Sequence, residues 1–222
     1  MPAEPHTLVC FAVKEETKFF TPPPNVRVLI TGMGRQNAFA KIEAYFAREI
    51  PAGVITCGFA GGLNPKLNLG DVLFDTDEGS PWEKALFASQ GTFARFLCAN
   101  RVACTANEKY KLWQVTGMDA VEMESDTIRQ FCLRKNIPSA TIRVVSDTVH
   151  EDLPLDFNHV LTPEYRLDFA KLTARLLLKP RLIAQLLHFQ GQTITAAQSL
   201  GAFLQMLLPV QPHKIASPSQ RG

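Results

Sequence analysis

Three acidic residues in the segment 121–147 have the type and spacing to do chemistry. Glu122 and Glu124 open a helical pattern in which Glu124 shares a face with apolar side chains. A carboxylate on an apolar face is unfavourable unless a polar group meets it there. Asp147 follows the β-branched run 139–145, at the carboxyl end of a predicted strand, where open α/β sheets bind ligands. Carboxylates placed in this way accept hydrogen bonds or transfer protons, so the segment predicts a functional site.

Strands that alternate with helices would hold these acids in place. Glycine turns are predicted after two of the strands, at Gly32–Gly34 and Gly58–Gly62. The alternation predicts an α/β sandwich. Apolar runs predict strands over residues 7–13, 26–31, 53–57, 71–74 and 139–145, and a helix over 37–50.

The remaining segments are predicted to be mostly helical. Residues 83–99 have a mixed helical pattern, 101–105 a strand pattern, and 106–114 the pattern of a loop or short helix. Helices are predicted over 164–178, 180–189 and 195–208. The predicted organisation is a domain over 1–178, a C-terminal helical extension over 179–210, and a disordered tail over 211–222.

Composition narrows the classes of protein. With 222 residues, 46% hydrophobic and 20% charged, the chain suits one domain with a sizeable core, or one domain plus a small appendage. The net charge of +2 argues neither for nor against nucleic acid, and without a Lys/Arg run no nucleic-acid partner is expected. The five scattered cysteines show no metal spacing and are typical of reduced core thiols. Without a signal peptide or a spanning apolar run, a soluble cytoplasmic protein is expected.

The two glycine motifs differ in what they indicate. The stretch after Gly32 follows a strand and precedes a helix, as a dinucleotide-binding motif does, but Asn37 occupies the third glycine position. Its glycines would still let backbone N–H groups approach a ligand. The stretch Gly58–Asp71 has four glycines, the last of them in its final Gly-Asp, and from the residues alone a structural double turn and a ligand-binding backbone are equally good interpretations.

Taken together, four motifs resemble the nucleoside phosphorylase/nucleosidase superfamily in their order and rough spacing. The resemblance covers about residues 8–175 and implies a three-layer α/β/α sandwich with a central mixed β-sheet, plus C-terminal helices. Within the family the chain looks most similar to hopanoid-associated adenosyl nucleosidases (often labelled phosphorylases) and to methylthioadenosine/S-adenosylhomocysteine nucleosidase, and less so to futalosine hydrolase. The motifs are Gly32-Met-Gly34, Gly58-x-Ala-Gly-Gly-Leu-x-Pro-x-Leu-x-x-Gly-Asp71, Val121-Glu-Met-Glu-Ser125 and Arg143-Val-Val-Ser-Asp147.

The resemblance implies a role for each matching residue. Asp147 matches the aspartate that binds purine N7 and donates a proton as the ribosidic bond breaks, which requires a raised pKa. Its alternative is a strand-end capping aspartate. Glu124 matches the glutamate that accepts from the ribose hydroxyls, and Met123 the methionine under the sugar, although alone it would be read as core filler. The other expected substrate-binding residues are Glu122, Ala60, Gly61 and Ser146.

The choice between water and phosphate as the nucleophile depends on Glu16. Ala12-Val-Lys-Glu-Glu16 aligns with the nucleosidase segment whose last glutamate activates water, whereas the Gly-Asp-Pro segment and phosphate-binding arginine of purine phosphorylases are absent. Glu16 therefore favours hydrolysis, unless it is simply a solvated glutamate at a helix start. Arg143, in mid-strand, would need a partner, for which Glu16 is a candidate. Arg35 would contact phosphate if the reaction were phosphorolysis.

Departures from the family bear on the substrate. Phe59 replaces a serine of the methylthioadenosine nucleosidases, and a short segment between Asp77 and Asn100 would open the 5′ side of the pocket to a bulky group such as a hopanoid chain. The leucine-rich helices after Pro180 favour packing or an oligomer contact over a lipid groove.

The implied function is cleavage of the N-ribosidic bond of an adenine-type nucleoside with a 5′ modification, by hydrolysis. The alternatives are a phosphate-dependent phosphorylase and a nucleoside-binding protein without turnover. The implied partners are the nucleoside, with water or phosphate, and a second copy of the chain, a dimer being favoured. Contact with a membrane surface stays open, and no metal or organic cofactor is implied.

Overall fold

A mixed sheet lies at the centre of the computed structural model, which describes residues 5–165 and 167–208. Within these residues the strands run in the order β2-β1-β3-β8-β4-β5, with β7 pairing β3 and β6 pairing β7. The pairs β3–β7 and β4–β8 are antiparallel and the others are parallel. The strands are β1 Thr7–Phe11, β2 Val26–Ile30, β3 Gly53–Gly62, β4 Val72–Thr76, β5 Thr92–Phe93, β6 Phe96–Cys98, β7 Ala120–Glu122 and β8 Ser139–Asp147.

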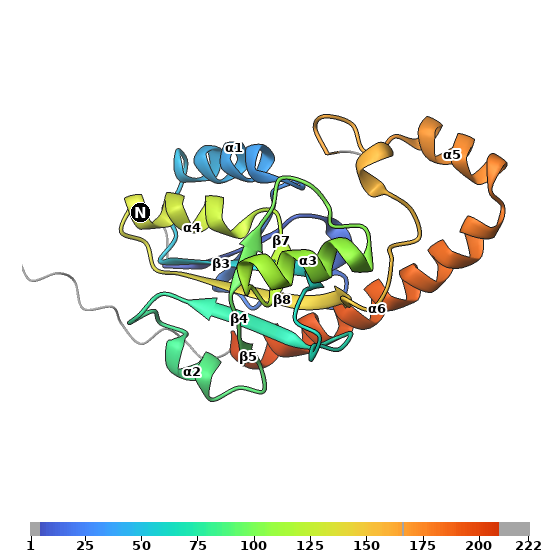
Figure 1. Ribbon diagram of the computed structural model, residues 1–222. Helices are drawn as coiled ribbons and strands as arrows, with labels where there is room; N and C mark the ends of the chain where they lie inside the picture. The colour runs from blue at the N-terminus through green and yellow to red at the C-terminus, as the bar shows by residue number, and fades with distance from the viewer. Residues whose placement is uncertain (1–4, 166, 209–222) are drawn as a thin grey trace, which may run out of the picture.

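Helices cover both faces of this sheet, as Figure 1 shows. On one face, α1 (Arg35–Phe46) and α4 (Ser125–Arg134) pack their apolar sides, including Ile42 and Phe131, against β1 and β3. On the other face, the C-terminal half of α6 (Arg181–Leu207) packs Leu200 and Leu204 over the largest core cluster. The sequence prediction of an α/β/α sandwich with a central mixed sheet is confirmed.

The two central strands are long and almost entirely buried. Side chains of β8 are buried at all nine positions, and β3 extends over ten residues. The predicted glycine turn at Gly58–Gly62 is therefore wrong, because this segment continues β3. A register shift between Ala60 and Gly61 places Gly61 opposite Asp147. The end of β3 is thus brought beside a predicted site residue.

The segment between residues 83 and 116 also differs from the prediction. The helix α2 spans only Glu83–Phe87, and the short strands β5 and β6 follow it. Residues 101–105 do not form the predicted strand, because the backbone N–H of Val102 donates to the side chain of Asn158 instead of a neighbouring strand. Residues 106–116 form the helix α3 (Ala106–Thr116), which begins at the N-cap Thr105.

The C-terminal helices are fewer than predicted, the first being shorter and the last longer. The helix α5 (Phe169–Leu178) begins at Asp168, whose side chain accepts from the N–H of Lys171. The two helices predicted over 180–208 form the single helix α6. The predicted helical extension starts at 179, yet the C-terminal half of α6 shares the core of the sheet, so the domain boundary stays a prediction. The predicted disordered tail, 211–222, lies outside the described residues.

The hairpin of α5 and the N-terminal half of α6 projects from the body of the molecule, as the orange part of Figure 1 shows. The short helices η1 (Lys14–Thr17) and η2 (Phe157–His159) complete the described elements. Among these residues no helix combines the length and apolarity needed to cross a membrane.

Candidate active site

A cavity of about 740 Å³ opens at the carboxyl ends of β1, β3 and β8. Four buried acids line it, Glu16 from η1, Glu122 and Glu124 from the β7–α4 junction, and Asp147 from β8. The structure therefore brings together acids that are up to 131 positions apart in the sequence, from 16 to 147. Charges of one sign gathered in a buried cavity need specific partners or a ligand.

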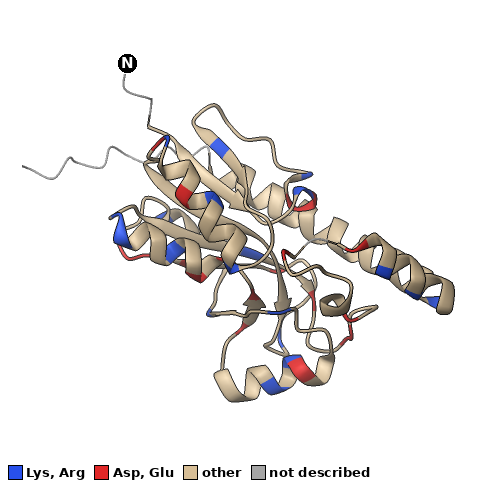
Figure 2. Ribbon diagram, turned by 90° about the horizontal axis from the view of Figure 1, so that it is seen from above, with Lys and Arg blue, Asp and Glu red and all other residues tan. Residues whose placement is uncertain are grey.

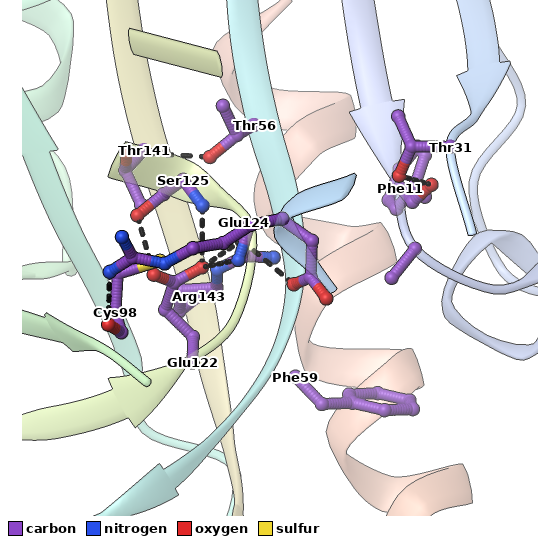
Figure 3. Close-up of polar contacts among 12 residues, drawn as sticks. Phe11, Thr31, Thr56, Phe59, Cys98, Glu122, Glu124, Ser125, Thr141 and Arg143 are labelled. Atoms are coloured by element: carbon purple, nitrogen blue, oxygen red, sulfur yellow. Dashed lines mark hydrogen bonds and ion pairs between the residues drawn. The ribbon is translucent and has the colours of Figure 1, made fainter. Parts of the chain in front are cut away.

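Arg143 neutralises part of this negative charge. Its Nη2 lies 2.6 Å from Oε2 of Glu122 and 3.6 Å from Oε2 of Glu124, and Figure 3 shows the three side chains together. The predicted ion pair between Arg143 and Glu16 is therefore replaced by pairs with the two glutamates of the β7–α4 junction. The β7–α4 junction can supply both partners because β7 pairs with the end of β3, and β3 also pairs with β8.

Glu122 accepts three hydrogen bonds from the two residues that begin α4. It accepts from the N–H of Glu124 at 2.9 Å, and from the N–H and hydroxyl of Ser125 at 2.7 and 2.8 Å. Burial acts to raise the pKa of Glu122, but Arg143 and these donors outweigh it and hold the pKa below its usual value. Glu122 is thus a fixed anion that orients the start of α4, and its predicted contact with substrate stays a prediction.

Glu124 retains capacity for a ligand. Its Oε1 accepts from the N–H of Gly34 at 2.7 Å, and its ion pair with Arg143 is longer than that of Glu122. Burial raises its pKa to about 7, Arg143 opposes the rise and Glu122 adds to it. Gly34 has φ +85°, which favours glycine, so the first glycine turn presents an N–H to Glu124. That contact, and not a dinucleotide, accounts for the turn.

Glu16 lies in a narrow place beside β3. Its Oε2 accepts from the N–H groups of Ala12 and Val13 at 2.8 and 3.0 Å, and its Oε1 from that of Phe59 at 2.8 Å. A Cβ on Gly58 would come within 2.4 Å of this Oε1 and 2.6 Å of Arg143 Nη1, so only glycine fits. Burial raises the pKa of Glu16 although Arg143 opposes it. The alternative of a solvated glutamate is wrong, because the side chain is buried.

Asp147 has a partner that the sequence interpretation missed. The ammonium of Lys109 lies 2.5 Å from Oδ2 of Asp147, and the Ser146 hydroxyl donates to Oδ1 at 2.8 Å. The same ammonium donates to the carbonyls of Thr148 and Glu151 at 2.8 and 3.0 Å. Burial raises the pKa of Asp147, and Lys109 and Ser146 limit the rise. A raised pKa is what a general acid requires.

Lys109 carried a signal that could have identified it. The residue shares a face of α3 with Leu112 and Trp113, three and four positions later, which pack in the apolar cluster beneath that helix. A cation on an apolar face is the same signal that drew attention to Glu124. Lys109 is 0% exposed, so its charge is entirely taken up by its carboxylate and carbonyl partners.

The remaining predicted residues divide into two groups. Ala60, Gly61, Met123 and Ser146 line the cavity, as expected for contacts around a sugar. Arg35 does not line it, because its guanidinium pairs with Asp126 at 3.8 Å and donates to the carbonyl of Cys98. In the described part of the chain no group of three or more His, Cys, Asp or Glu side chains has the arrangement of a metal site.

Comparison with known proteins finds similarity to nucleosidases. The sequence model of the family described as Phosphorylase superfamily matches residues 92–178, which hold Lys109, Glu124 and Asp147. A 5′-methylthioadenosine/S-adenosylhomocysteine nucleosidase of Anoxybacillus flavithermus is 26% identical over 171 residues, covering 62% of this chain and 74% of that protein. The chain is thus similar to the Phosphorylase superfamily over residues 92–178, and to a nucleosidase over 171 residues.

Solved structures of nucleoside hydrolases share the fold. The futalosine hydrolase of Helicobacter pylori superimposes with a TM-score of 0.62 at 14% identity, covering 92% of this chain and 97% of that one. The 5′-methylthioadenosine/S-adenosyl homocysteine nucleosidase of Campylobacter jejuni gives 0.64 at 15% identity, with 92% and 99% covered. The particular similarity to hopanoid-associated members stays a prediction.

Proposed function

We propose that this protein hydrolyses the N-ribosidic bond of a purine nucleoside that carries an apolar 5′ substituent. The observation that carries the proposal is the convergence of Asp147, Glu16 and Glu124 on one cavity, each with a pKa raised by burial. The names of the relatives, methylthioadenosine/S-adenosylhomocysteine nucleosidase and futalosine hydrolase, support the same class of reaction.

Asp147 acts on the leaving base. As the bond between the sugar C1′ and the purine N9 breaks, the proton of the Asp147 carboxyl passes to the purine N7, and the base leaves neutral. A general acid of this kind contributes about 10²–10⁴-fold to the rate. Lys109, 2.5 Å from Oδ2, then stabilises the carboxylate that remains.

Glu124 and Glu16 act on the sugar and on water. Glu124 accepts hydrogen bonds from the ribose hydroxyls and, as an anion, stabilises the positive charge that develops on the sugar ring. The attacking water forms its bond to C1′ and gives its proton to Glu16. Burial raises the pKa of Glu16, which makes its carboxylate a stronger base.

The charge balance of the cavity favours water over phosphate. Among the described residues the buried Lys and Arg side chains are Lys109, which pairs with Asp147, and Arg143, which pairs with Glu122 and Glu124. The other cations in its lining, Lys41 and Arg101, are exposed. Phosphate would therefore meet uncompensated carboxylates, whereas water meets a base.

An apolar wall supports the 5′ substituent. It comes from the loop after β8 and from α6. None of residues 77–100, which the structure describes in full, lines the cavity. A bulky hydrocarbon group, such as a hopanoid chain, would bury its surface against these side chains. They include Leu153, Phe157, Leu161, Leu167 and Phe189.

The test is release of adenine from adenosines with 5′ groups of increasing apolar size, with and without phosphate. We expect release without phosphate, lost in Asp147→Asn and Glu16→Gln and kept in Glu43→Gln, an exposed glutamate of α1. Release that requires phosphate and yields a ribose 1-phosphate would replace hydrolysis by phosphorolysis. Binding without any release would make the protein a nucleoside-binding protein.

A further inference from the structure

The projecting hairpin lacks a core of its own. It consists of α5 and the N-terminal half of α6, residues 169–195, and not one of these side chains is buried. Buried positions begin only at Ala196, where α6 meets the sheet. An isolated pair of short helices gains little stability from helix propensity, so its apolar side chains call for a surface that covers them.

Apolar side chains gather at the end of the hairpin. Leu177 and Leu178 at the end of α5 are 78% and 82% exposed, and Ile183 and Leu187 of α6 are 51% and 62% exposed. A shallow depression of about 260 Å³ runs between the helices and is lined by Ile183, Leu187 and three further residues of the hairpin. The lining residues from α6, which are Ile183, Leu186, Leu187 and Gln190, fall on one side of that helix at spacings of three and four residues.

The charges of the hairpin all have one sign. Lys171, Arg175, Lys179 and Arg181 are close in sequence to the apolar positions, and the blue segments on the projecting helices in Figure 2 mark such cations. No Asp or Glu follows Asp168 anywhere in the 222-residue sequence. Lys171 pairs with Asp168 at 3.4 Å. Within the part of the chain that the structure describes, the other three cations form no ion pair.

We infer that this hairpin docks on an anionic membrane surface. Leucine and isoleucine side chains between basic residues are the composition of helices that lie in the interface of a bilayer. Two copies of the hairpin packed face to face would bring eight like charges together, since each carries four cations. An anionic lipid surface instead complements the cations and covers the apolar side chains. The inference extends beyond the proposed catalytic function and does not depend on it.

Flotation of the full chain with lipid vesicles tests the inference. The vesicles are of phosphatidylcholine alone or of phosphatidylcholine with 30% phosphatidylglycerol, a composition chosen for the assay. We expect binding to the anionic vesicles, weakened by salt. Each removed cation should reduce the partition coefficient about fivefold, so Lys179→Gln/Arg181→Gln should reduce it about 25-fold. Leu177→Gln/Leu178→Gln should also reduce it.

Matched variants on the body control for general effects. Arg48→Gln/Lys135→Gln removes two exposed cations elsewhere, and Val115→Gln/Leu133→Gln removes two exposed apolar side chains. Both should bind as the unaltered protein does. All four variants change exposed side chains, so each should fold, which circular dichroism checks.

Three results would overturn the inference. The first is no binding to anionic vesicles, and the second is equal loss in hairpin and control variants. The third is a dimer, seen by analytical ultracentrifugation without lipid, that the hairpin variants abolish, because a second copy would then cover this face.

Discussion

Replacing Lys109 by Met tests the link between this residue and the proposed general acid. The ammonium is 0% exposed and lies 2.5 Å from Oδ2 of Asp147. Removing one partner of a buried ion pair costs about 3–5 kcal/mol, because the other charge stays buried without compensation. Lys111→Met is the matched control, since Lys111 is exposed on the same helix; a change within about 0.5 kcal/mol is expected there.

The pH dependence has a definite sign. Burial already raises the pKa of Asp147, and Lys109 lowers it, so Lys109→Met should raise it further. A folded-state pKa above the unfolded value means that stability is greatest below the unfolded pKa and is lost as pH rises through the folded pKa. The stability deficit of Lys109→Met should therefore be small in acid and grow as pH rises. Activity that needs protonated Asp147 should persist to higher pH.

A double-mutant cycle gives the sharpest test. The free energies of unfolding of Lys109→Met, Asp147→Asn and the double variant are measured by urea denaturation at neutral pH. Because Asp147→Asn removes the stranded charge, the double variant should be more stable than the sum of the single effects predicts. Agreement with the sum within about 0.5 kcal/mol would refute the coupling, as would a pH–activity profile of Lys109→Met with an unmoved alkaline limb.

Two further perturbations test the geometry around the other acids. Gly58→Ala places a Cβ 2.4 Å from Oε1 of Glu16 and 2.6 Å from Nη1 of Arg143, so it should destabilise the protein by about 1–3 kcal/mol and reduce activity. Gly191→Ala is the control, because a Cβ at this mid-helix position would meet nothing within 4 Å. It should stabilise the protein by about 0.5–1 kcal/mol. Similar effects of the two substitutions on thermal unfolding would contradict the crowding described at Gly58. Because burial raises the pKa of Glu124 to about 7, KM for the nucleoside should rise as pH falls below about 7 and Glu124 loses its charge. Glu124→Gln should raise KM and remove that dependence; a KM of the unaltered protein that is constant between pH 6 and 8 would argue against the ribose contact.

Local pattern was sufficient for much of the fold. The apolar runs predict β1, β2 and β8 closely. Of these, β1 and β8 are buried at every position, and buried strands have a largely apolar sequence. The acids of the cavity could also be identified, since each stands at the end of such a run or in a motif that resembles the family. A local pattern cannot explain a residue type that is required by contact with a residue far away in the sequence.

The glycines of β3 illustrate that limit. In sequence, Gly58–Gly62 is typical of a turn, yet the segment is extended. Gly58 is required because Glu16 and Arg143 pass beside it, and a Cβ on Gly61 would lie 3.3 Å from Oδ2 of Asp147. These contacts join residues 16, 58 and 143, so no local window contains them. Glu122, at the end of β7, and Arg143, in β8, are also far apart in the sequence. Their pairing could therefore not be predicted from a local pattern.

The differences in pKa among the four acids of the cavity follow from these pairings. Arg143 and Ser125 hold Glu122 as an anion, and that anion raises the pKa of its neighbour Glu124. Lys109 takes up one oxygen of Asp147 without cancelling the effect of burial. Two cations thus serve four acids unequally, so one acid stays charged while the pKa values of the other three are raised. The raised pKa values suit the proposed roles of Asp147 as proton donor and of Glu16 as proton acceptor.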